Sequence, residues 1–164
     1  MENTKNKKLV INEKKLKDIV ARVLNVQSFD AIDDETLKVV ANDLFTHCTT
    51  AAFVQLDSDD LETFATDPKS FFIKIFKGKL PTIKKELAEQ IPSYSDGKKY
   101  QALVAINFHE ELELTAYERE QLLTVVRNGN DDIDIWWSYA YDKRLSKKEF
   151  RVDLFVKKGK YEID

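Results

Sequence analysis

The sequence predicts an α+β fold, a two-layer sandwich in which three N-terminal helices precede a β-α-β-α-β-β segment with helices packed on a four-stranded sheet. Two observations lead to this prediction. In the first third of the chain, apolar residues recur at the spacing of amphipathic helices. From residue 70 onward, period-two stretches alternate with helical ones, and prolines, glycines and capping residues separate them. This order of elements is typical of helices that pack on one sheet.

The N-terminal part predicts three helices. The first begins at the cap Asn12, and the second begins at Asp33 with acidic residues in its first turn, where the helix dipole favours them. Residues 51–56 form a short apolar link, and a third, short helix begins near Asp57. The apolar stripe of the first helix consists of Leu16, Ile19, Val20, Val23 and Leu24, and that of the second consists of Leu37, Val40, Ala41, Leu44 and Cys48.

The remaining chain predicts four strands and two helices. Pro81 suits the first turn of a helix over 81–91, and Thr115 with Glu118 forms a capping box for a helix over 115–128. The last two strands are joined by a long turn and predict a hairpin. The four strands are Ser70–Lys77, Tyr100–Phe108, Ile133–Tyr141 and Phe150–Val156.

Length and cysteine content limit the class of protein. A chain of 164 residues suits one domain over 1–164, with a helical part at 10–50 and an α/β part at 52–157. One cysteine allows no internal disulfide, which is typical of a reducing compartment. No apolar run approaches the ~20 residues that span a bilayer. We therefore expect a cytoplasmic protein that does not enter a membrane.

The charged residues are arranged in blocks. Residues 28–67 hold ten acids and one base, whereas residues 143–160 hold eight bases and two acids. The net charge is −3, and a nucleic-acid binder is usually basic in total, so we expect no nucleic-acid partner. The blocks are either the solvated faces of successive elements or an asymmetry that suits head-to-tail contact with another charged surface.

The motifs of the common nucleotide and metal sites are missing from the sequence. Its four glycines form no G-x-G-x-x-G and no G-x-x-x-x-G-K-[S/T] pattern that could wrap a phosphate. No H-E-x-x-H pair is present either. We therefore expect no cofactor and no metal ion.

Several motifs between residues 52 and 157 occur in an order that one known family shares. They are the loop Gln55-Leu56-Asp57-Ser58-Asp59-Asp60, of the form N-x-D-x-x-D; the helix start with Leu112, Leu114 and Glu118, of the form L-x-L-x-x-x-E; and the final strands with Ile133, Ile135, Asp142, Leu145, Arg151 and Val152.

In this order the motifs resemble the C-terminal domain of FtsZ, the bacterial tubulin homologue of cell division. The helix at 34–48 is then similar to the lower part of the family's long central helix. The sequence departs from the family at several points. Gln55 stands where asparagine is usual, Ser138 replaces a glycine, and the glycine-rich loop of the nucleotide-binding domain is missing.

The resemblance implies roles for the aspartates of the first motif. In the family, the two aspartates that match Asp57 and Asp60 reach into the next subunit of a filament and help to activate water against the nucleotide bound there. Asp57 and Asp60 are therefore the candidate catalytic residues, because a carboxylate can orient a water molecule or accept its proton. Together with Gln55 they are also candidates for partner binding. The structural alternative is that Asp57 only caps a short helix.

Two histidine-containing pairs have a functional and a structural interpretation. Cys48 belongs to an apolar stripe, so this cysteine is expected to pack in the core, and a structural role is favoured for the pair His47-Cys48. His109 follows a central strand and is flanked by two glutamates, which would suit a base or a metal ligand. Because no second ligand stands at a metal-binding spacing, a structural or surface role is favoured.

The aromatic residues of the third strand predict one buried and one accessible tryptophan. Trp136 and Trp137 are neighbours on a strand, so their rings point to opposite faces. Tyr139 and Tyr141 share the face of Trp137 and are expected to share its burial. Trp136 is the candidate for an exposed contact with a partner.

Three classes of function remain. The first, which we favour, is a non-catalytic interaction module that contacts a filament-forming GTPase or another copy of this chain. The second is an accessory domain that supplies Asp57 and Asp60 to a partner's nucleotide hydrolysis. The third is a small α+β enzyme, which the missing nucleotide and nucleophile motifs disfavour without settling whether a catalytic activity exists.

A nucleotide titration tests the missing phosphate loop. We expect that the isolated chain neither binds nor hydrolyses GTP or ATP, because nothing in its sequence could wrap a phosphate. Calorimetry with each nucleotide and a phosphate-release assay measure this directly. A micromolar affinity for either nucleotide would contradict it.

Overall fold

The computed structural model describes residues 27–28, 34–48, 52–54, 70–91, 98–112, 114–128 and 133–162. The α+β class is confirmed in this part of the chain. The predicted helices that begin at Asn12 and near Asp57 lie outside the described residues. The elements are β1 (Gln27–Ser28), α2 (Asp34–His47), β2 (Ala52–Val54), β3 (Ser70–Gly78), α4 (Leu80–Gln90), β4 (Lys98–Phe108), α5 (Ala116–Arg127), β5 (Asp134–Tyr141) and β6 (Phe150–Glu162).

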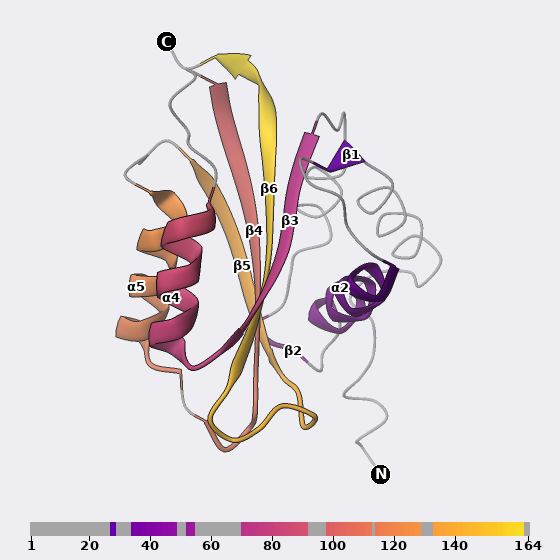
Figure 1. Cartoon of the computed structure of the whole chain (residues 1–164), viewed down its shortest axis with the longest axis vertical. Coiled ribbons are helices and arrows are strands. Elements are labelled where there is room, and N and C mark those ends of the chain that lie inside the picture. The colour runs from indigo at the N-terminus through magenta and orange to yellow at the C-terminus, as the bar shows by residue number, and fades with distance from the viewer. Residues whose placement is uncertain are drawn as a thin grey trace.

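One mixed sheet organises the molecule, with the strand order β1-β3-β6-β4-β5-β2 (Figure 1). All four predicted strands are present and form its centre. Two short strands are added at the edges, so the sheet has six strands where four were predicted. β2 lies in the segment predicted as a link and pairs antiparallel with β5, Ala52 opposite Ala140. A strand of three residues is too short to show a periodicity in the sequence.

The predicted hairpin of the last two strands is wrong, because β4 lies between β5 and β6. β4 pairs parallel with β5, and β6 pairs antiparallel with both β3 and β4. Residues 151–156 of β6 are all buried, which suits a strand covered on both faces. Alternation in the sequence indicates which residues share a face, but it does not determine which strand is the neighbour.

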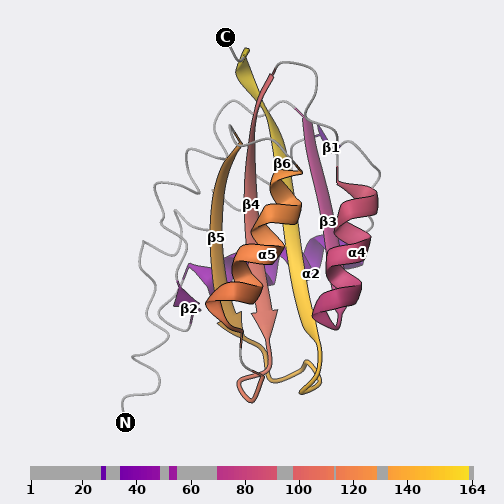
Figure 2. The same ribbon diagram turned by 90° about the vertical axis from the view of Figure 1, so that its left-hand side faces the viewer.

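Helices cover both faces of the sheet, so the predicted two-layer arrangement is corrected to three layers. α4 and α5 lie side by side on one face, and α2 crosses the strands on the other (Figures 1 and 2). The central strands are apolar on both sides, and each side has to be covered. Among the described helices, none is long and apolar enough to cross a membrane.

The apolar core fills the space between the sheet and the pair α4 and α5. The two helices contribute their buried apolar residues, and alternate residues of the four long strands face them. The fully buried members include Ile83 and Leu87 of α4, Leu122 and Val126 of α5, Val104 and Ile106 of β4, and Val152 and Leu154 of β6.

The predicted capping box of α5 is present. Thr115 Oγ1 accepts a hydrogen bond from the backbone N–H of Glu118 at 3.1 Å, and Glu118 Oε1 accepts from the backbone N–H of Thr115 at 3.0 Å. The helix ends at Asn128, whose left-handed φ of 47° is the usual conformation after a last helical turn. α4 begins with Pro81 in its first turn, as predicted.

Removal of the α5 cap should destabilise the domain without changing its fold. We expect Thr115→Ala to lower the free energy of unfolding by about 0.5–2 kcal/mol, because a backbone N–H loses its acceptor. Thr115→Ser keeps the hydroxyl and serves as the control. Urea unfolding measures the free energy of unfolding of both variants. If Thr115→Ser loses as much stability as Thr115→Ala, the lost cap is not the cause.

Candidate functional site

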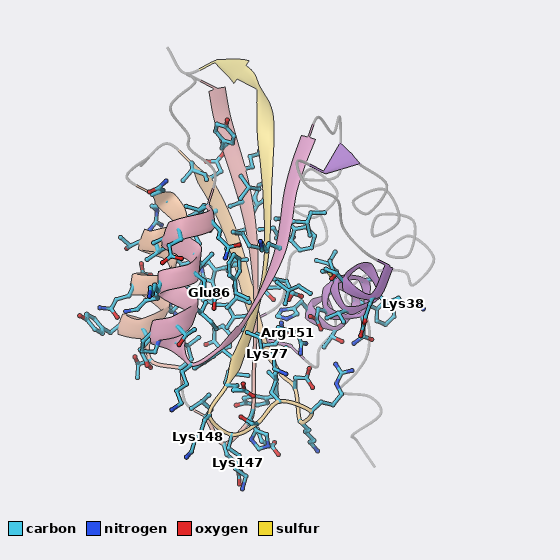
Figure 3. All side chains as sticks on the ribbon, viewed as in Figure 1. Lys38, Lys77, Glu86, Lys147, Lys148 and Arg151 are labelled. Carbon is cyan, nitrogen blue, oxygen red and sulfur yellow. The ribbon has the colours of Figure 1, made fainter. Side chains whose placement is uncertain are left out.

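A group of buried polar side chains lies between α2 and the sheet, and we call it the polar belt. In Figure 3, Arg151 projects into the space between the sheet and α2. The strand register brings the sheet residues together, since Arg151 is opposite Asn107, and Asp153 and Ser138 both flank Ala105. The belt consists of Asp43 and His47 on α2 and of Asn107, Ser138, Asp142, Arg151 and Asp153 on the sheet, all buried.

His47 connects α2 to two central strands. Its Nε2 lies 2.9 Å from Asn107 Oδ1, and its Nδ1 is hydrogen-bonded to Ser138 Oγ. Asn107 Nδ2 donates to the backbone oxygen of Arg151 at 3.1 Å, so Asn107 Oδ1 is the acceptor. The proton of the neutral ring is therefore on Nε2, and Nδ1 accepts from the Ser138 hydroxyl.

Burial lowers the pKa of His47, although the hydrogen bond to Asn107 and the charge of Asp43 oppose this shift. The ring is thus neutral at physiological pH, as its two hydrogen bonds require. The order serine, histidine, amide matches that of nucleophile, base and orienting group in hydrolases. However, Ser138 and His47 have 0% exposure, so no substrate can reach the hydroxyl. In this conformation the group fastens α2 to the sheet.

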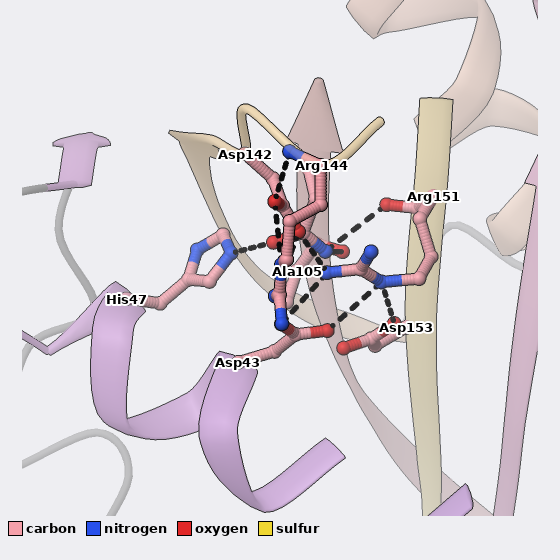
Figure 4. Close-up of polar contacts among 8 residues, drawn as sticks. Asp43, His47, Ala105, Asp142, Arg144, Arg151 and Asp153 are labelled. Carbon is pink, nitrogen blue, oxygen red and sulfur yellow. Dashed lines mark hydrogen bonds and ion pairs between the residues drawn. The ribbon is translucent and has the colours of Figure 1, made fainter. Parts of the chain in front are cut away.

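Arg151 is the centre of the charged half of the belt (Figure 4). Its guanidinium donates to both oxygens of Asp43, at 3.1 and 2.8 Å, and to Asp142 Oδ2 at 2.8 Å. Arg144 completes the group with two side-chain hydrogen bonds to Asp142, each 3.0 Å long. Burial alone would raise the pKa of Asp142, but the hydrogen bonds from Arg144 and Arg151 outweigh it and hold that pKa below its usual range.

Asp153 is the one acid of the belt without a hydrogen-bond donor among the described residues. Neither of its carboxylate oxygens accepts a hydrogen bond from a described residue, and its ion-pair distance to Arg151 Nε is 3.8 Å. Burial, followed by the neighbouring Asp43, raises its pKa well above the usual range. A protonated Asp153 beside an ionised Asp43 avoids two adjacent negative charges and provides an O–H that can donate to Asp43.

Most of the residues proposed from the sequence are not part of the belt. Gln55, Asp57 and Asp60 lie outside the described residues. Trp136 is half-buried, on the face of β5 that also carries Ser138. The structure therefore leaves the proposed contact roles of these four residues as predictions.

The aromatic residues on the other face of β5 follow the prediction in part. Trp137 stacks on Tyr139, with ring centroids 5.5 Å apart, and Arg119 lies 4.5 Å from the centroid of Trp137. Both rings are half-buried against the core. The predicted burial of Tyr141 is wrong, since this residue is 42% exposed at the end of β5.

The histidine pairs agree with their structural interpretations. Cys48 and His47 are both fully buried, and burial raises the pKa of the Cys48 thiol to about 12. His109 accepts a hydrogen bond on Nδ1 from the backbone N–H of Glu111 at 3.1 Å. In the described ranges, no cluster of three or more histidine, cysteine or acidic side chains could hold a metal ion.

The belt itself was not predicted from the sequence. Asp43 and His47 are four positions apart on α2 and therefore lie on the same face, and Asp153 interrupts the apolar run of β6. A charged residue inside an apolar strand is a signal for a buried polar partner. Its partner on α2 is 110 residues away, and local patterns do not reveal such pairs.

Replacing Asp153 or Asp142 by asparagine should change the free energy of unfolding in opposite directions. We expect Asp153→Asn to raise the free energy of unfolding at pH 7 by about 1–3 kcal/mol, because the amide can donate to Asp43 and no carboxyl has to be buried. In the native protein, the unfolded chain releases this proton above about pH 4, whereas the folded chain retains it. The gain should therefore shrink as the pH falls towards 4.

Asp142→Asn is the matched control. The folded-state pKa of Asp142 is lowered, so its carboxylate stabilises the fold above the unfolded pKa, and this contribution is lost as the pH falls. We expect this variant to be less stable at pH 7 and to approach the native protein in acid. Thermal melts between pH 4 and 7 measure the stability of both variants. If Asp153→Asn is less stable than the native protein at pH 7, the ionised form of Asp153 stabilises the fold and the prediction is wrong.

Comparison with known proteins finds similarity in structure alone. No protein-family model matches the sequence, and no curated protein matches it. The structure is similar to an empty FtsZ dimer from M. jannaschii, with a TM-score of 0.54 and 18% identity over 89% of this chain and 43% of that chain. For a point mutant of the same FtsZ, the TM-score is 0.55 and the identity 16%, over 80% and 42%. The resemblance to FtsZ is thus confirmed at the level of the fold, and the chain spans less than half the length of the FtsZ chains it matches.

Proposed function

We propose that this chain is a non-catalytic protein-interaction module with an FtsZ-like fold, which modulates a filament-forming or GTPase partner. The observation that carries the proposal is the fold similarity, which covers 89% of this chain but only 43% of FtsZ. A domain with the backbone fold of part of a filament protein can present its helices and strands to a partner in the same arrangement, which supports a partner of the same kind.

The polar groups of the described residues support a non-catalytic role. The hydrogen-bonded group of Ser138, His47 and Asn107 is closed to solvent, with exposures of 0%, 0% and 2%. The carboxylates of Asp43 and Asp142 are occupied by Arg151. The sequence also offers no glycine-rich phosphate loop. The polar belt thus presents no nucleophile and base that a substrate could reach.

The proposed contact residues are Gln55, Asp57, Asp60 and Trp136. Gln55 directly follows β2, the edge strand that pairs with β5. Val54 is opposite Tyr139, three residues from Trp136 on the same strand. The edge strand that ends one residue before Gln55 in the sequence is thus a neighbour of the strand that carries Trp136, and this supports the proposal of a common contact region.

An accessory role in hydrolysis is the second candidate, because Asp57 and Asp60 keep the spacing of the FtsZ motif. In that case the two carboxylates would orient water at a nucleotide that a partner holds. The partner's hydrolysis rate would then depend on both aspartates. A pure binding role would leave that rate independent of them.

Filament experiments separate these proposals. We expect the native chain to co-sediment with FtsZ filaments and to change their GTP hydrolysis rate. Asp57→Asn combined with Asp60→Asn should weaken co-sedimentation about tenfold or more, since two charges leave the contact. Asp59→Asn, in the same segment but outside the motif, is the matched control and should behave like the native chain. If hydrolysis alone responds to the double variant, the accessory role is supported.

The capping interpretation of Asp57 predicts a different pattern. Asp57→Ala would then lower the melting temperature, and Asp57→Asn would largely restore it, because asparagine caps as well as aspartate does. Filament binding would be the same in all variants. If the double asparagine variant retains both its stability and every interaction of the native chain, the proposed role of this segment is wrong.

A further inference from the structure

The turn between β5 and β6, residues 142–149, gathers exposed positive charge on an acidic protein. It lies at the end of the sheet where β3, β4 and β5 finish, and Lys147 and Lys148 mark it in Figure 3. We call it the basic turn. Its acids are Asp142, which is buried and bound to arginine, and Glu149. Its four bases are Lys143, Arg144, Lys147 and Lys148, all exposed, while the chain as a whole has a net charge of −3.

The backbone of the basic turn is held by hydrogen bonds and by one buried side chain. The N–H of Asp142 donates to the oxygen of Phe108 at 2.8 Å, and that of Leu145 donates to the oxygen of Asp142 at 3.1 Å. The N–H of Glu149 donates to the oxygen of Ser146 at 3.3 Å, and the Leu145 side chain is 5% exposed. A partner would therefore bind a preformed turn, which keeps the entropic cost of binding low.

Part of the positive charge is not neutralised by the protein. Arg144 is bound to Asp142, and Lys147 Nζ lies 2.7 Å from Glu111 Oε2 in an exposed pair, which water and salt weaken. Lys143 and Lys148 form no ion pair with any described residue. Arg144 and Arg151 balance the buried carboxylates Asp142 and Asp43, so Lys143 and Lys148 supply the positive charge that remains on the surface of the turn.

An exposed aromatic side chain adjoins these charges. Tyr141 is 42% exposed and holds its ring edge-on to Phe108, with centroids 5.2 Å apart. Tyrosine and arginine are enriched at protein interfaces, where a tyrosine ring adds contact area at low entropic cost. A partner that contacts the bases also covers this ring.

We propose that the basic turn and Tyr141 form a docking surface for an acidic segment of a partner protein. The positive charge recognises carboxylates, and Tyr141 supplies an apolar contact beside them. A protein is favoured over a nucleic acid because Glu110 and Glu111 border the turn and the whole chain is acidic. A phosphate backbone would meet these repulsive charges along its length, whereas a short acidic segment would not.

This inference rests on the proposed function, because it assigns the partner chemistry of one surface of an interaction module. It does not depend on the partner being a filament or a GTPase. The experiment below contains no FtsZ, so its failure is distinguishable from failure of the filament experiments. The acidic motif from Asp57 to Asp60 is also left unchanged in every variant.

Fluorescence anisotropy with a labelled short peptide, in which a few adjacent glutamates are flanked by neutral residues, tests the docking surface. We expect the native chain to bind the peptide at low salt and to release it as salt increases. Lys143→Glu, Lys147→Glu and Lys148→Glu combined should weaken binding about tenfold or more. The matched control, Lys38→Glu, Lys74→Glu and Lys85→Glu combined, carries the same change of net charge on exposed residues elsewhere and should bind within about twofold of the native chain.

Three results would overturn the inference. They are no binding of the peptide to the native chain, an equal loss in the control, and tighter binding of a labelled thymidine oligonucleotide than of the peptide. The last would identify the turn as a nucleic-acid surface. A thermal melt checks that each variant is folded. If the triple Lys→Glu variant does not fold, the same three lysines are changed to glutamine instead. The affinity of this variant for the peptide should be at least about threefold lower than that of the native chain.

Discussion

One guanidinium group connects three parts of the chain that are distant in sequence. Arg151 on β6 binds Asp43 on α2 and Asp142 at the end of β5, and all three side chains are buried. Removing a single partner of such a group leaves an uncompensated charge in a place where water cannot solvate it. The position of α2 on the sheet and the geometry of the 142–149 turn therefore both depend on this contact. Arg144 depends on it indirectly, because it binds the carboxylate that Arg151 orients.

Protonation keeps the polar belt electrically balanced. Burial leaves His47 neutral, and the burial of Asp153 favours its neutral, protonated form. The remaining charges of the belt are the carboxylates of Asp43 and Asp142 and the guanidinium of Arg151, and the exposed Arg144, which lies outside the belt and binds Asp142, supplies the second positive charge. A neutral total is what a buried polar layer requires, since each excess charge would bear a desolvation cost of several kcal/mol. The belt thereby holds α2 against a surface that also contains fully apolar residues such as Leu103 and Phe155.

The sequence predicted features that depend on neighbouring residues and missed those that depend on distant ones. The capping box of Thr115, the Pro81 start of α4 and the four long strands follow from short patterns, and all are present. The position of β6 between β3 and β4 depends on pairing choices that alternation does not encode. The face on which α2 packs depends on Asp43 meeting Arg151, 108 residues later in the chain. Asp153 inside an apolar strand was the visible sign of this buried polar layer.

The two proposed contact regions each include a residue of β5, and these residues lie at different positions and on opposite faces of the sheet. Trp136 and Tyr141 are both on β5, five residues apart, which corresponds to about 17 Å along a strand. Because side chains alternate between faces, Trp136 belongs to the α2 side of the sheet, and Tyr141 belongs to the side of α4 and α5. β5 is central enough to be held by β4 along its whole length, so the two regions keep a fixed separation. The two proposals therefore assign separate surfaces to partner contact, one beside β2 and one at the basic turn, and β5 sets the distance between them.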